Sequence, residues 1–243
     1  MKFPVPVYFE AIRLLEKADE RPNLEQIAEQ LQSSDVRERV LAMIELQKEA
    51  VPAQSALPLI KEALVDQNIQ IRGMAAFALG IKPTSESLSL LVQILESDSD
   101  HNMRSMAAGS LGYLEDKRAL ESLRHAFYED THWLVQFSAA VALGNLKDLQ
   151  AQSVLLEALE SSQMLLQEAA IAALGEIGAI EVLDRLLPFA ESEDWMIRKR
   201  LAEALGNLPD PRSTVMLRDL EQDSNVQVAE AAQRSRQRLA ELL

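Results

Sequence analysis

Small and apolar residues recur along the chain in a nine-residue unit that appears five times. The units read RGMAAFALG, RSMAAGSLG, QFSAAVALG, QEAAIAALG and RKRLAEALG, and they begin at Arg72, Arg104, Gln136, Gln167 and Arg198. Their starts lie 32, 32, 31 and 31 residues apart. A fixed period of this size indicates a solenoid, in which each unit buries its apolar face by stacking on its neighbours.

The spacing inside each unit predicts a helix. With the first residue counted as position 0, positions −1, +3, +4 and +7 are small or apolar, as in Met103, Ala107, Ala108 and Leu111. Residues three and four apart share one helix face. Alanines at +3 and +4 allow neighbouring helices to approach closely, and the Gly at +8 suits the left-handed residue that ends many helices.

A second helix is expected after each unit. Its marker is a leucine at +19 in all five repeats: Leu91, Leu123, Leu155, Leu186 and Leu217. Acids six residues before three of the units favour a turn or an N-cap: Asp66, Asp98 and Asp130. The Arg at position 0 is interpreted as structural, bonding acids or carbonyl groups of adjacent repeats. The pattern predicts an all-α solenoid of about six or seven helix pairs.

The ends of the repeat array are degenerate, as the ends of a solenoid must be where they face water. An earlier unit without the glycine is assigned to Arg37, and a polar last unit begins near Ala229. We expect residues 1–23 to form an N-terminal cap helix and turn, and residues 24–243 to form a single solenoid domain.

Composition narrows the function classes. The chain carries a formal net charge of −14, which disfavours binding to a phosphate backbone, so no nucleic-acid partner is expected. It has no cysteine, which excludes disulfides, thiolate metal sites and cysteine nucleophiles on this chain. Without an apolar run long enough for a signal peptide or a membrane span, the protein is expected to be cytoplasmic, with no membrane insertion.

The sequence contains few residues or motifs that indicate catalysis or metal binding. No phosphate-binding loop, HExxH or GxSxG motif occurs, so no catalytic residue is assigned. His101 and His132 occupy near-equivalent places in adjacent repeats, and helix packing predicts a separation of about 10 Å. That distance is too long for a shared metal ion, and no metal site or resident cofactor is expected.

The outward positions of the repeat helices, −3, −2, +1, +2, +5 and +9, are rich in large apolar side chains. Both tryptophans of the chain fall at position −3. An exposed stripe of this kind marks a partner-binding surface. The alternative is that the −3 residues fold under the loops and pack on the next repeat. The candidate partner-binding residues are Ile69, Met74, Phe77, Met106, Tyr113, Trp133, Leu134, Phe137, Val141, Trp195, Met196 and Arg200.

Acidic residues collect in the turns before these helices. They include Glu96, Asp98, Asp100, Glu129, Asp130, Glu191, Glu193 and Asp194. Two interpretations stay open: a solvated rim, or an electrostatic rail for a basic partner.

The unit resembles a known family. The pattern D-x-x-x-x-[VIM]-R-x-x-A-A-x-x-L-G, seen here as DQNIQIRGMAAFALG and DSDHNMRSMAAGSLG, is similar to the short HEAT-like repeat of the phycobilisome-lyase (E/F) type found in cyanobacteria. The resemblance covers about residues 24–240. It implies a superhelical solenoid whose concave inner face is lined by the Arg/Ala/Gly helices.

The outward apolar face and the resemblance together give three hypotheses for the function. The leading hypothesis is a non-enzymatic scaffold or chaperone-like protein that holds a partner protein in its concave aromatic groove. The second is a phycobilin lyase, or bilin-binding chaperone, that positions a transient bilin for a phycobiliprotein subunit; Arg200 or Lys199 would then meet the propionate groups. The third is a partner of an iron–sulfur carrier protein, which would itself hold any cluster.

Overall fold

The computed structural model describes residues 23–242, and it consists of helices joined by short turns, with no strand in that range. The first helices of successive pairs are α2 (Leu24–Leu31), α4 (Ala53–Ala63), α6 (Ser87–Ser97), α8 (Leu120–Glu129), α10 (Gln152–Leu159), α12 (Leu183–Leu186) and α14 (Pro211–Leu220). The second helices are α3 (Val36–Gln47), α5 (Ile69–Ile81), α7 (His101–Leu114), α9 (Trp133–Asn145), α11 (Met164–Glu176), α13 (Trp195–Leu205) and α15 (Val226–Leu242). Short 3-10 turns adjoin α8, α10 and α12: η1 (Lys117–Ala119), η2 (Leu149–Ala151), η3 (Ile180–Val182) and η4 (Leu187–Glu191).

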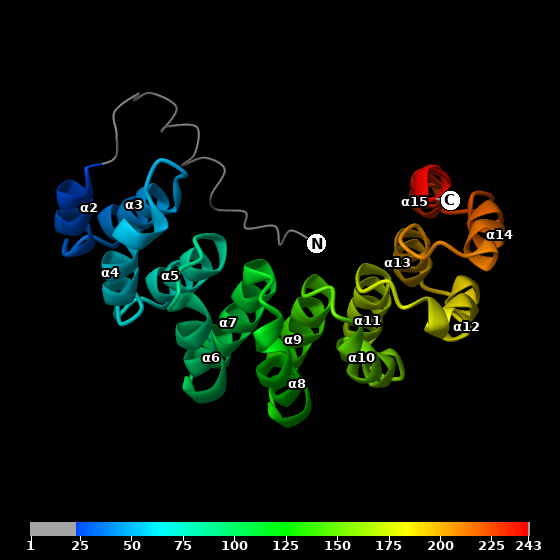
Figure 1. Cartoon of the computed structure of the whole chain (residues 1–243), viewed down its shortest axis with the longest axis horizontal. Helices are drawn as coiled ribbons and strands as arrows, with labels where there is room; N and C mark the ends of the chain where they lie inside the picture. Colours follow the sequence, from blue (N-terminus) through cyan, green and yellow to red (C-terminus); the bar gives the residue numbers. More distant parts are fainter. Residues whose placement is uncertain (1–22, 243) are drawn as a thin grey trace.

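The helix pairs stack into an open arch (Figure 1). The second helices, which carry the nine-residue units, form its inner layer, and the first helices form its outer layer. The marker leucines of the outer helices are all buried between the layers: Leu91, Leu123, Leu155, Leu186 and Leu217. The predicted all-α solenoid with a concave inner face is therefore confirmed. The cap expected over residues 1–23 lies outside the described residues except for Asn23, which caps α2.

The repeated glycine has a different role from the one its position suggested. The prediction that it is the left-handed residue ending the helix is wrong, because Gly80, Gly112 and Gly144 lie inside right-handed helices. In three repeats a left-handed residue comes three positions later, and in two of them it is not a glycine: Glu115, Lys147 and Gly178.

The glycine instead allows close approach of the next inner helix. A Cβ placed on Gly144 would lie 2.7 Å from the Cα of Ala173, and one on Gly112 would lie 2.9 Å from the Cα of Ala142. Because no side chain fits at this distance, the glycine column sets how tightly the inner layer packs. Gly206 meets Ser235 in the same way, which confirms the last unit at Ala229.

The Arg at position 0 is structural, as predicted, and Arg104 and Arg198 each join their repeat to the next one. The Arg104 guanidinium donates to both carboxylate oxygens of Asp130, at 2.6 and 3.0 Å, and to the carbonyl oxygen of Asp98 at 2.9 Å. Arg198 makes the same bidentate pair with Asp223. Such fork-on-carboxylate pairs are stronger than single contacts between point charges.

These Arg–Asp pairs also correct the position at which the first repeat begins. Arg39, and not Arg37, makes the bidentate pair with Asp66 and donates to a carbonyl oxygen six residues earlier, that of Ser33. The first unit therefore begins at Arg39. The degenerate sequence hid this, since the unit RVLAMIELQ ends in glutamine where the others have glycine.

The Arg–Asp pairs between repeats make the free energy of unfolding sensitive to acid. Burial alone would raise the pKa of Asp130, but hydrogen bonds from Arg104 and from the backbone of His132 outweigh it and hold that pKa below its ordinary value. A hydrogen bond from Arg198 likewise lowers the pKa of Asp223. A carboxyl with a depressed folded-state pKa stabilises the fold above its unfolded-state pKa, and this contribution is lost as the pH falls through the folded-state value.

We therefore expect Asp130→Asn to cost about 1–2 kcal/mol near neutral pH. The difference from wild type should hold above about pH 5 and close as the pH falls below about 4, because protonated Asp130 has lost the same charge. Urea unfolding followed by circular dichroism across that range measures it. A difference that stays constant down to about pH 2.5 would show that the Asp130 charge contributes nothing.

No helix in residues 23–242 combines the length and apolar character needed to cross a lipid bilayer.

Candidate protein-binding surface

The concave side of the arch is built from three columns of the inner helices, at positions +2, +5 and +9. Helix geometry turns positions +5 and +9 away from the outer layer and from both neighbouring inner helices, whereas position +2 lies at the junction with the preceding inner helix and is buried in several repeats. Over the C-terminal repeats they form a groove of about 430 Å³ that crosses α9, α11, α13 and α15. Its lining includes Val141, Asn145, Ala169, Ala172, Glu176, Arg200, Glu203, Asn207, Arg234 and Arg238.

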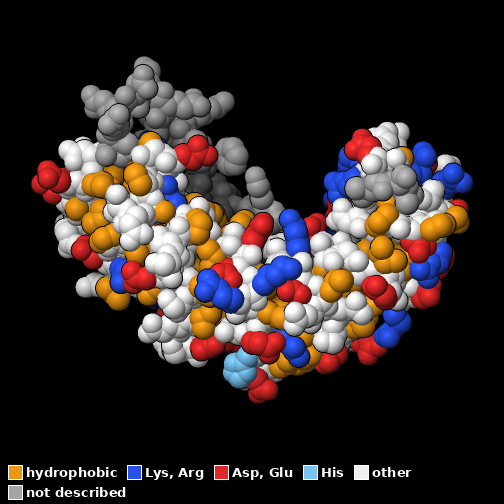
Figure 2. Space-filling view, in the orientation of Figure 1, with side chains coloured by type: hydrophobic (Ala, Val, Ile, Leu, Met, Phe, Trp, Pro, Cys, Tyr) orange, Lys and Arg blue, Asp and Glu red, His pale blue; other side chains and the backbone are white. Residues whose placement is uncertain are grey.

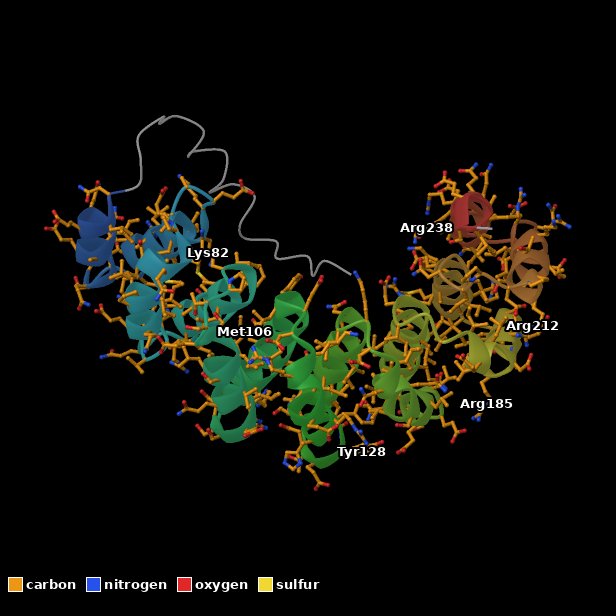
Figure 3. The ribbon with its side chains drawn as sticks, in the orientation of Figure 1. Lys82, Met106, Tyr128, Arg185, Arg212 and Arg238 are labelled. Carbon is orange, nitrogen blue, oxygen red and sulfur yellow. The ribbon has the colours of Figure 1, made fainter. Side chains whose placement is uncertain are left out.

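In the N-terminal repeats the same columns carry mostly apolar side chains, several of them exposed. The large exposed side chains there are Leu41 on α3, Ile81 on α5, and Met106 and Tyr113 on α7. The ring of Tyr113 meets that of Phe77 edge to face, with centroids 5.4 Å apart. Met106, labelled in Figure 3, fills the space that a side chain on Gly73 would occupy, so its tip is held in place. This part of the hollow therefore exposes apolar side chains on three successive inner helices.

In the C-terminal repeats the columns are polar and are linked by hydrogen bonds across successive helices. Arg238 donates to the side-chain oxygen of Asn207 at 2.9 Å, and Asn207 donates to Glu176 at 3.4 Å. Figure 2 shows Lys and Arg side chains gathered on the C-terminal end of the arch, and Figure 3 places Arg238 on α15 beside the hollow. The concave surface therefore changes from apolar to charged along its length.

Arg200 lies in the floor of the charged part. Its guanidinium donates to Glu203 at 2.7 Å and lies 4.0 Å from the buried carboxylate of Glu168. Burial raises the pKa of Glu168 above its ordinary value, against the opposing effect of the Arg200 charge. Arg200 is thus engaged by acids of its own and the preceding repeat, and a ligand carboxylate would have to replace Glu203.

The residues proposed from the sequence fall into two groups. Phe77, Met106, Tyr113, Val141 and Arg200 belong to the concave columns, whereas Met74 in the same columns is buried. The −3 and −2 residues lie instead at the first turns of the inner helices, along the edge of the arch. On that edge Trp133 and Met196 are exposed, and Leu134 is half-buried.

Three further proposed residues are partly buried against the core: Ile69, Phe137 and Trp195. For Ile69 and Trp195 the packing matches the alternative interpretation of the −3 column, while exposed Trp133 does not.

Sequence reasoning missed Leu41, Arg234 and Arg238. Leu41 escaped because the first repeat was placed two residues out of register. The two arginines occupy positions +5 and +9 of the last unit, so extending those columns to the polar final repeat would have found them.

The distance predicted between His101 and His132 is wrong. The rings of His101 and His132 stack with centroids 3.6 Å apart, not about 10 Å as helix packing suggested. They meet because His101 starts α7 while His132 is the N-cap of α9, accepting from the backbone N–H of Leu134 through Nδ1. No group of three or more potential metal ligands occurs among residues 23–242.

Comparison with known proteins supports the fold independently. The sequence profile of HEAT repeats matches residues 21–104, 88–165 and 154–235. No curated protein sequence matches significantly. Among solved structures, the complex of CpcE and CpcF of phycocyanin lyase from Nostoc sp. PCC7120 is similar, with a TM-score of 0.61 and 24% identity over 74% of this chain and 75% of that one.

Two other solved structures show the same architecture. A Kap95p–RanGDP complex matches with a TM-score of 0.58 and 15% identity over 92% of this chain and 36% of that one. An engineered protein matches with a TM-score of 0.54 and 22% identity over 89% of this chain and 68% of that one. These likenesses concern the fold. With the repeat profile spanning nearly the whole described region, the chain belongs to the HEAT-repeat family.

Proposed function

We propose that this protein is a non-enzymatic binding protein that holds a segment of another protein along its concave inner surface. The observation that carries the proposal is the run of exposed apolar side chains on α3, α5 and α7, which face the hollow and not the core: Leu41, Ile81, Met106 and Tyr113. Large apolar side chains exposed together on one face of a protein commonly mark a partner-binding surface. The polar columns beyond it supply donors and acceptors that fix the partner's register.

The test compares matched variants of the full chain in affinity capture from native extract, read by mass spectrometry. Ile81→Ser/Tyr113→Ser removes two exposed concave side chains, and Leu149→Ser/Val215→Ser removes two exposed apolar side chains of the outer layer. We expect the first variant to lose its partner, with affinity reduced roughly tenfold or more, and the second to retain it. A partner kept equally by both variants would contradict concave binding, and circular dichroism checks that both variants fold.

The identity of the captured protein separates the candidate partners. A phycobiliprotein subunit or an iron–sulfur carrier are the two that the sequence resemblance suggests. Either would be recognised by the same concave surface. Because this chain has no cysteine, a thiol that carries a bilin, or the cysteines that hold a cluster, would belong to the partner.

A second candidate function is transient binding of a bilin. It is favoured by the Phe77–Tyr113 pair, which with Met106 offers an apolar aromatic surface against which a flat tetrapyrrole can lie. The chain would then act by positioning the chromophore for an acceptor protein. Adding free bilin tests it directly: a shift of the visible spectrum that Ile81→Ser/Tyr113→Ser abolishes supports the candidate, and an unchanged spectrum removes it.

A further inference from the structure

A second apolar surface lies outside the concave columns, on the edge where the inner helices begin. Five large side chains there are exposed: Trp133 (45%), Met164 (51%), Leu165 (48%), Met196 (39%) and Val226 (66%). They belong to the first turns of α9, α11, α13 and α15, and we call them the apolar edge. Stacked repeats place equivalent turns side by side, about 8–10 Å apart, so the edge is a strip roughly 25–30 Å long.

The core does not require these side chains. The buried anchor of each first turn is the neighbouring −1 residue: Val135, Leu166, Ile197 and Val228. The exposed residues just before these anchors leave their apolar surface to solvent in four successive repeats. At the N-terminal end the strip continues onto α7 through the stacked rings of His101 and His132, the latter 6.2 Å from the Trp133 ring.

Acidic groups border the strip. Three exposed acids come just before α9 and α13: Glu129 ends α8, Glu191 ends η4, and Glu193 lies in the loop that follows. None of them forms an ion pair with another described residue. Two cations of these inner helices, Arg104 and Arg198, are engaged by Asp130 and Asp223. The border therefore presents uncompensated negative charge to a partner, in a chain that is already strongly acidic.

We infer that the apolar edge docks an amphipathic α-helix of a partner protein, with basic side chains flanking its apolar stripe. The geometry fits: seven residues of an α-helix rise about 10.5 Å, close to the spacing of the inner helices, so a stripe with a heptad repeat meets one first turn after another. Lysine or arginine beside the stripe pairs with the acidic border. This surface is separate from the concave columns, and the inference does not rest on the proposed concave binding.

The probe is a fluorescein-labelled synthetic peptide of about 18 residues with leucines on one helical face and lysines elsewhere. A second peptide has the same composition in scrambled order, so that no apolar face forms. Fluorescence anisotropy with the wild-type full chain, over a range of salt concentrations, should show tighter binding of the patterned peptide than of the scrambled one. Equal binding of the two would overturn the inference, because only net charge would then be recognised.

Variants of the chain locate the site. Leu165→Ser/Met196→Ser should weaken binding of the patterned peptide roughly tenfold or more, while the outer-layer variant Leu149→Ser/Val215→Ser changes it less than about twofold. Glu191→Gln/Glu193→Gln should weaken binding a few-fold and flatten its salt dependence, since a screened contact has been removed. Binding that survives in the first variant would refute docking at this edge.

Two controls distinguish docking at the apolar edge from binding in the hollow and from self-association of the chain. The concave variant Ile81→Ser/Tyr113→Ser should bind the patterned peptide like wild type; a loss there would place the peptide in the hollow and overturn the edge assignment. Light scattering gives the oligomeric state: a wild-type dimer that Leu165→Ser/Met196→Ser dissociates would make a second copy of this chain the occupant, again against the inference.

Discussion

Gly144→Ala is expected to destabilise the protein by about 1–3 kcal/mol, although alanine favours a helix over glycine by about 1 kcal/mol. The added Cβ would lie 2.6 Å from the Cβ and 2.7 Å from the Cα of Ala173 on the next inner helix. Since one of those atoms is backbone, the clash can be relieved only by moving α9 and α11 apart. In a solenoid, whose stability is a sum of neighbour contacts, this weakens one junction in the middle of the array.

Thermal unfolding followed by circular dichroism measures the effect. The midpoint should fall by several degrees, at about 2–4 °C for each kcal/mol in a chain of this size, and the transition should broaden as the two halves uncouple. Gly109→Ala is the matched control, because nothing lies within 4 Å of a Cβ built on that glycine of α7. It should be neutral or slightly stabilising. Equal destabilisation by both variants would show that close helix approach is not the reason for the repeated glycine.

Arg104→Met is expected to cost about 2–3 kcal/mol. The change leaves the Asp130 carboxylate, whose side chain is only 8% exposed, without its bidentate partner. It also removes the donor to the carbonyl oxygens of Asp98 and Ser99 in the preceding loop. One substitution therefore removes the ion pair that joins two neighbouring repeats. Urea unfolding gives the cost as a shift of the midpoint at constant slope.

Arg118→Met is the control for loss of an arginine as such. Arg118 pairs with Asp116, but its side chain is 76% exposed, so little or no change in the unfolding midpoint is expected. The double variant Arg104→Met/Asp130→Asn tests the mechanism, because it removes the uncompensated charge while keeping an acceptor for the backbone of His132. Adding Asp130→Asn to Arg104→Met should cost less than it costs in wild type. Strictly additive effects would mean that the two groups do not act as a pair.

Much of the architecture followed from the sequence because local patterns of the solenoid repeat. Ala107 and Leu111 recur with helical spacing at a fixed period, and Leu123 marks the outer helix in the same way, so both layers and their order were predictable. The structural role of Arg104 was also predictable, since a long basic side chain beside Asp-containing turns finds acids and carbonyls there.

Relations between repeats were decided only by the tertiary structure. Position 144 needs a glycine because Ala173 leaves no room for a side chain, and not because the helix ends there. This depends on the distance between α9 and α11, not on either helix alone. The stacking of His101 on His132 likewise depends on how consecutive helix ends are offset.

Which of the candidate residues are exposed was also decided only by the tertiary structure. Trp133 and Trp195 share a column of the repeat, yet one is exposed and the other packs against the core. The repeat sequence determined which residues occupy equivalent places along the helices. The curvature and closeness of the stacked helices determined which of those places remain open, because burial in a solenoid depends on the neighbouring repeat.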